Sequence, residues 1–184
     1  MTCTRRSPRW RIGDPRMIKP NSVRSPLYTA AERLRRDSSR WTLVQGILAP
    51  LQFAVFLVSL WLVLRYLMTG DGLAAATVSI VIKTLVLYTI MITGSLWEHD
   101  VYGKYLFARA FFWEDVVSIL VLALHTAYLV ALFSGLLDAR QQMILALLAY
   151  AAYMVNATQF LWKLRAARLD MASRPTVGTL SIAE

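Results

Sequence analysis

Long uninterrupted runs of apolar residues dominate the chain from about residue 43 onward. A helix needs about 20 apolar residues to cross a bilayer core that is about 30 Å thick. The runs lack the short apolar–polar alternation that is typical of strands in a soluble sheet. They predict four membrane-spanning helices, at Leu43–Leu64, Leu73–Ser95, Val116–Leu137 and Met143–Leu161.

Two of the three connections between these runs have the composition of tight turns. Gly70-Asp71-Gly72 separates the first two runs, and Asp138-Ala139-Arg140 separates the last two. Glycine and charged residues are typical of such turns at a membrane surface. The predicted fold class is therefore an all-α membrane protein, a four-transmembrane-helix bundle with an interfacial helix or loop between helices two and three.

The two ends of the chain have a different composition from the middle. Residues 1–26 are rich in Arg, Pro and Ser and predict a disordered basic tail. The first forty residues lack the apolar stretch of a cleavable signal peptide. Thr29 and Glu32 fit a capping box, which predicts a short helix from about Thr29. We predict a membrane domain over residues 27–169 and a flexible tail over 170–184.

Composition and charge narrow the class of protein further. The chain is 57% hydrophobic and 17% charged, which is too apolar for a soluble protein of 184 residues. Its net charge of +9 is concentrated before Trp41, after the fourth run and between the second and third runs. The positive-inside rule therefore places both termini and the middle loop on the cytoplasmic side of a bacterial inner membrane. This distribution explains the basic pI without a nucleic-acid partner. Cys3 is the only cysteine, which excludes an internal disulfide and a cysteine-rich metal site.

Polar residues inside the predicted spans fall at two levels. Intramembrane polar groups are costly, so each needs a partner or a function. At about 1.5 Å per residue from the interfacial tryptophans, one level lies near mid-membrane. It contains Gln52, Lys83, His125 and Tyr150. The second lies at the cytoplasmic boundary and contains Gln45, Glu98, Glu114, Asp115 and Gln159. Hydrogen bonds between helices are the alternative to ligand contacts for the uncharged members, and a structural role is the alternative for His125.

The segment 97–115 combines carboxylates, cations and seven aromatic residues. An ordinary connecting loop does not need so many aromatic side chains. This composition predicts a segment that folds back against the bundle and forms the mouth of a site for a large, flat, partly polar ligand.

Several stretches resemble a known family, the vinyl bacteriochlorophyllide hydratases of purple phototrophic bacteria. The resemblance covers about Leu27 to Leu169. The stretches that carry it are Leu27–Thr29, Trp41–Phe53, Tyr105–Ala108, Phe111–Asp115 and Ala123–Tyr128. It implies a hydro-lyase that adds water across the 3-vinyl group of a chlorophyllide-type macrocycle, giving a 3-(1-hydroxyethyl) group in bacteriochlorophyll biosynthesis.

The implied reaction leaves the redox state unchanged, so no cofactor is expected beyond the magnesium that the substrate itself carries. The chain has no glycine-rich dinucleotide motif and no cysteine cluster. The expected partners are the tetrapyrrole substrate, membrane lipid and other enzymes of the same biosynthesis.

Acid-assisted hydration needs a protonated carboxyl group and a second group that orients water. Glu114, Asp115 and Glu98 form the one cluster in the sequence that offers both. We assign Glu114 as the acid and Asp115 or Glu98 as the base.

The substrate can be posed in more than one way. His125 is the first candidate for an axial ligand of the substrate magnesium, although it lies about 16 Å along a helix from Glu114. In a second pose, Lys104, Arg109 or Arg165 holds the propionate at the surface and the vinyl group points inward. His125, Tyr128 and Lys83 then surround the reacting carbon. In the reverse pose Lys83 pairs with the propionate. Gln52, at the same depth, is a further contact.

Two other functions remain compatible with the pattern. A pigment carrier or assembly factor needs the aromatic cleft and a magnesium ligand but no acid. A small transporter could use Lys83 and the polar stripes as a path, but the chain lacks the internal repeat of many transporters.

Overall fold

The computed structural model describes residues 28–172, which form helices and connecting loops without a β-strand. The predicted all-α bundle is confirmed, because four helices are long and apolar enough to cross a membrane. The predicted tail over residues 1–26 lies outside the described residues, and so does most of the predicted tail over 170–184. The helices are α1 (Ala30–Ser38), α2 (Arg40–Thr69), α3 (Leu73–Tyr102), α4 (Phe112–Ser134) and α5 (Ala139–Ala172).

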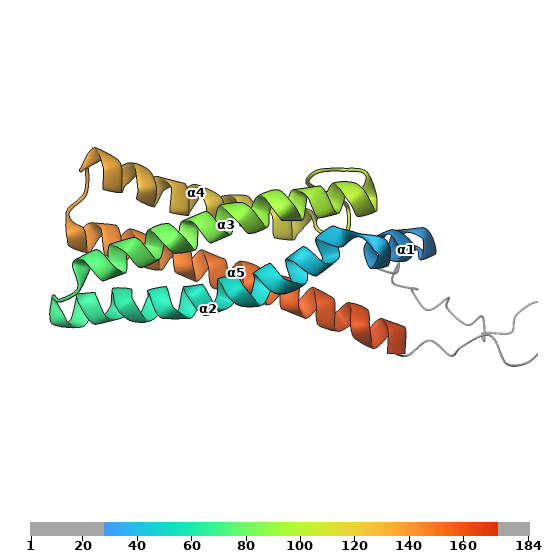
Figure 1. The fold of residues 1–184 in the computed structure, drawn as a ribbon, viewed down its shortest axis with the longest axis horizontal. Helices are drawn as coiled ribbons and strands as arrows, with labels where there is room; N and C mark the ends of the chain where they lie inside the picture. The colour runs from blue at the N-terminus through green and yellow to red at the C-terminus, as the bar shows by residue number, and fades with distance from the viewer. Residues whose placement is uncertain (1–27, 173–184) are drawn as a thin grey trace, which may run out of the picture.

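The four long helices run up and down along one bundle axis (Figure 1). The α2–α3 and α4–α5 turns lie at one end, and α1 and the α3–α4 loop lie at the other, which we call the loop end. Both ends of the described chain are also at the loop end. Helix α2 packs along α3 and α4 packs along α5, so the bundle consists of two hairpins. These hairpins contact each other less extensively, through α2 with α5 and α3 with α4.

The helices extend beyond the apolar runs that predicted them. Helices α2 and α3 each have 30 residues, or about 45 Å at 1.5 Å per residue, which exceeds the hydrocarbon thickness. The additional turns reach the interface, where polar side chains do not interrupt a helix. An apolar run therefore predicts the buried length of a span rather than the full helix.

The predicted boundary between the third and fourth spans was wrong by several residues. Helix α4 ends at Ser134, because Gly135 adopts a left-handed conformation with φ of 67° and donates its N–H to the Ala131 carbonyl. Helix α5 begins at Ala139, where Asp138 and Gln141 exchange backbone-to-side-chain hydrogen bonds of 3.0 and 2.8 Å. Asp138 thus starts a helix rather than ending one.

Helix α1 covers part of the loop end by packing against α3. Its predicted capping box is present, since Thr29 and Glu32 satisfy each other's backbone N–H groups. Tyr28 stacks on Tyr102 at 6.0 Å, and the Arg36 guanidinium lies 4.9 Å from the Tyr28 ring. Burial raises the pKa of Tyr28, so its phenol stays neutral within this aromatic contact.

Candidate functional site

The three carboxyl groups predicted for catalysis meet at the loop end. Glu98 is on the last turns of α3, and Glu114 and Asp115 are on the first turn of α4. All three are buried, with 5%, 8% and 4% of their surface exposed. Carboxylates are rarely buried to this degree without specific partners, so their contacts indicate what each group can do.

Glu98 and Asp115 form a pair that also holds the α3–α4 loop. Their carboxyl groups lie close enough to interact with each other. Asp115 accepts the Phe107 N–H at 2.7 Å, and Glu98 accepts the Ala108 N–H at 3.4 Å. Phe107 has a φ of 60°, a costly conformation for a non-glycine residue, which the Asp115 hydrogen bond helps to fix. The predicted interfacial helix or loop is therefore a loop, folded back onto the two helices that it joins.

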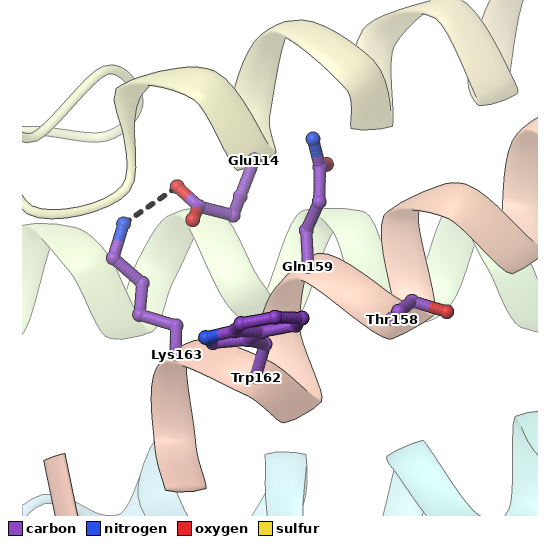
Figure 2. Close-up of a pocket in the computed structure, with 5 residues that line it drawn as sticks. All are labelled: Glu114, Thr158, Gln159, Trp162 and Lys163. Carbon is purple, nitrogen blue, oxygen red and sulfur yellow. Dashed lines mark hydrogen bonds and ion pairs between the residues drawn. The ribbon is translucent and has the colours of Figure 1, made fainter. Parts of the chain in front are cut away.

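Glu114 has a different partner, because its side chain faces α5. The Lys163 Nζ atom donates to its Oε2 atom at 2.7 Å. This ion pair borders a pocket of about 370 Å³ between α4 and α5, within the usual range for small-molecule sites. Figure 2 shows Lys163 and Glu114 facing each other across the gap and the Trp162 ring on the same wall as Lys163. The lining residues are Glu114, Thr158, Gln159, Trp162 and Lys163.

Neither Trp162 nor Lys163 was predicted from the sequence as a residue of the site. A usable signal was present, because Gln159 and Lys163 are four residues apart and so share one face of a helix. The sequence could not show that this face meets Glu114, since that contact depends on how α4 and α5 pair.

A second set of polar side chains lies in the interior, between the two hairpins. Lys83 is completely buried, and its Nζ atom is 3.9 Å from the centre of the Tyr153 ring. His125 is 1% exposed, and its ring is 5.9 Å from that of Tyr150. Gln52 and Tyr128 are also buried. We call Gln52, Lys83, His125 and Tyr128 the mid-bundle cluster.

The carboxyl groups at the loop end and the mid-bundle cluster are separate sites. Glu114 and His125 lie on one uninterrupted helix, about 16 Å apart along its axis. They therefore cannot contact the same small part of one ligand. Lys104 and Arg109 are on the exposed side of the α3–α4 loop, away from the lining of the pocket.

Comparisons with known proteins identify the family. The sequence model described as 2-vinyl bacteriochlorophyllide hydratase (BCHF) matches residues 28–166. A 2-vinyl bacteriochlorophyllide hydratase of Rhodobacter capsulatus is 64% identical over 165 residues, covering 88% of this chain and 95% of that protein. A protein of the same name from Cereibacter sphaeroides is 65% identical over 157 residues, covering 84% and 98%. No solved structure matches the chain. With the family model covering nearly all described residues and the relatives covered almost completely, the chain belongs to the 2-vinyl bacteriochlorophyllide hydratase family.

Proposed function

We propose that this protein adds water across the vinyl group of a bacteriochlorophyllide-type macrocycle and that the reaction occurs at the loop end. The names of the two relatives support the substrate, and their position number, 2 rather than 3, leaves the reaction class unchanged. In this reaction the C=C π bond breaks and one C–H and one C–O bond form. Water supplies the oxygen, and no electrons are gained or lost, so the proposal needs no redox cofactor.

The main support for the proposal is that the three buried carboxyl groups lie in two different environments. Glu114 is paired with the cationic side chain of Lys163. Glu98 and Asp115 lie close to each other, and within the described chain each also accepts a backbone N–H group. Two carboxyl groups at such range, mostly shielded from water, are best accommodated with one shared proton.

This division exchanges the roles expected from the sequence. The Glu98–Asp115 pair holds the proton and is the better acid, which protonates the terminal vinyl carbon. The macrocycle delocalises the positive charge that develops at the adjacent carbon. Glu114, as a carboxylate, accepts a proton from the attacking water, and Lys163 holds Glu114 in place. Glu114 then passes the proton that it took up to the adjoining residue, Asp115. This transfer restores the proton that the Glu98–Asp115 pair donated to the vinyl group.

The surroundings of the pocket suit an amphipathic pigment. Trp162 is 76% exposed and offers an aromatic surface at the membrane-facing side of α5. A macrocycle that stacks there can present its edge to Glu114 while its apolar face remains in lipid. Lys104 and Arg109 are exposed near the same end and can attract the propionate of the pigment. The substrate's magnesium belongs to the pigment. In this pose it lies outside the bundle, and His125 is too deep to be its axial ligand.

We further propose that the protein lies in the bacterial inner membrane with its loop end in the cytoplasm. In the described chain, the cations are concentrated at the loop end, on α1, the α3–α4 loop and the last turns of α5. The opposite end has only Arg65 and Arg140. This asymmetry is what the positive-inside rule requires. Substrate and product would then pass through the lipid to other enzymes of the same biosynthesis.

A direct test uses the purified full-length protein in detergent with a vinyl-bearing bacteriochlorophyllide and no added cofactor. We expect a blue shift of the long-wavelength absorption band, because saturating the vinyl group shortens the conjugated system. Mass spectrometry should find a product heavier by one water, with oxygen-18 incorporated when the solvent is H₂¹⁸O. A pigment that binds but never changes would contradict the proposal and favour a carrier or assembly factor.

A further inference from the structure

The mid-bundle cluster contains polar atoms that the protein itself does not satisfy. The Gln52 Oε1, Lys83 Nζ, His125 Nε2 and Tyr128 hydroxyl atoms have no hydrogen-bond partner among residues 28–172. Each of these four side chains is at least 97% buried. Leaving a buried polar group unpaired is costly, so four together, from three helices, indicate a polar ligand.

The donors and acceptors of the cluster define what that ligand must be. The His125 Nδ1 atom lies 2.8 Å from the Val121 carbonyl oxygen, which can only accept, so Nδ1 carries the proton. A second cation beside Lys83 would be costly, so the imidazole is neutral and Nε2 offers a lone pair. Gln52 Oε1 also accepts, Lys83 donates, and the Tyr128 hydroxyl can do either.

This mixture fits water better than an anion or a metal ion. A carboxylate bound to Lys83 would face the lone pairs of His125 and Gln52. A metal ion bound to His125 would face the Lys83 ammonium. Water can accept from Lys83 and donate to the acceptors of the cluster, and buried waters usually make about three hydrogen bonds each.

A line of polar groups leads from this cluster to the pocket. Asn156 donates to the Ser118 hydroxyl at 2.8 Å, one turn inward from Glu114, while its own Oδ1 atom is unpaired within the described chain. Gln159, which lines the pocket, has its Oε1 atom unpaired in the same way. On α5, Gln159, Asn156 and Tyr153 are three residues apart, so they follow one face from the pocket inward.

We infer that the mid-bundle cluster binds water inside the membrane, and that Asn156 and Gln159 connect this water to the pocket beside Glu114. That this water supplies the hydration reaction rests on the proposed function, because a hydratase consumes one water in each turnover. A macrocycle stacked over the pocket would hinder access from the lipid side, and an internal supply would bypass it. The presence of the water does not depend on the pigment.

Radiolytic hydroxyl labelling tests the presence of the water directly. The full-length protein in lipid nanodiscs would be exposed to a short X-ray pulse in H₂¹⁸O, and oxygen-18 on each residue would be measured by mass spectrometry. We expect labelling of Tyr128 and His125 in spite of their burial. Met143, which is reactive but completely buried in the apolar core, should remain unlabelled.

Variants of the cluster connect the water to turnover. Lys83→Leu, and the milder Gln52→Leu in case the first fails to fold, should reduce the label on Tyr128. They should lower kcat about five- to tenfold, the effect of about one hydrogen bond, with an unchanged pigment Kd. Thr84→Val is the matched control, because Thr84 is also completely buried but its hydroxyl is satisfied by the Ile80 carbonyl. It should change neither the label nor kcat.

Two results would overturn the inference. Labelling of Tyr128 no greater than that of Met143 would mean that the cluster is dry. A tenfold rise in pigment Kd in the Gln52→Leu or Lys83→Leu protein, with the label retained, would make the cluster a pigment contact instead. Failure of the proposed function is recognised separately, as wild-type protein that is labelled at Tyr128 but never hydrates the pigment.

Discussion

The loop end and the mid-bundle cluster both bury polar groups, but they satisfy them differently. At the loop end the three buried carboxyl groups of Glu98, Glu114 and Asp115 each have a partner, either Lys163 or a backbone N–H group. In the mid-bundle cluster each of the four buried side chains has a polar atom that lacks a partner within the described chain. Groups held by fixed partners are preorganised for proton transfer, whereas unpaired groups are suited to a small mobile ligand. This difference is why we propose that the loop end carries out the chemistry and that the mid-bundle cluster supplies water.

Removing the proposed base, Glu114, should lower kcat more than the other single substitutions discussed below. Glu114→Gln keeps the shape of the side chain but cannot accept a proton, so kcat should fall about 10²- to 10⁴-fold. Pigment binding, measured by absorption titration, should change little. The matched control is Asp100→Asn, which alters an exposed carboxylate near the same end and should leave kcat unchanged. Equal losses in both variants would show that general charge at the loop end matters rather than Glu114.

The ion pair at the pocket should have an intermediate effect. Lys163→Met removes the cation that positions Glu114, and kcat should fall about 10- to 100-fold because the carboxylate is misplaced. Lys163→Arg should recover most of the rate, since it restores the charge and a hydrogen-bond donor. Arg168→Met, an exposed cation further along α5, serves as the control. A Lys163→Met protein with normal kcat would disprove the positioning role.

The contact between the two regions should have the smallest effect. Ser118→Ala removes the acceptor of the Asn156 amide and should lower the free energy of unfolding by about 0.5–1 kcal/mol, measured in detergent. Ser134→Ala is the control, because its exposed hydroxyl bonds only carbonyl groups of its own helix. A loss of several kcal/mol in Ser118→Ala would mean that this contact mainly holds α4 against α5 rather than connecting two sites.

The sequence predicted the architecture well because the bilayer imposes it. Apolar runs of sufficient length specify spans, and Gly70 and the capping residues Thr29 and Glu32 mark real helix boundaries. The predicted end of the third span, Leu137, lies beyond the end of α4 at Ser134. The prediction took Asp138 as the turn, whereas Gly135 ends the helix. Local conformational preferences of glycine decide such boundaries more strongly than charge does.

The site was predictable only in part. The rise per residue along a helix placed Glu98, Glu114 and Asp115 at one level, and the structure brings them together. Periodicity could not indicate which of them would pair with Lys163, because that depends on contact between helices far apart in sequence. The proposed exchange of acid and base roles rests on this contact. The unpaired atoms of the mid-bundle cluster were likewise not visible before the packing of all four helices was known.

The most direct test of the account is single-turnover hydration by the Glu98→Gln, Asp115→Asn double variant, compared with its affinity for the pigment. Both substitutions preserve the side-chain shapes but remove the shared acidic proton. The account predicts normal pigment binding, a folded protein, and a hydration rate at least about 100-fold below that of the wild type. Hydration at the wild-type rate by this folded, pigment-binding variant would contradict the assignment of the acid, and with it the division of roles between the two regions.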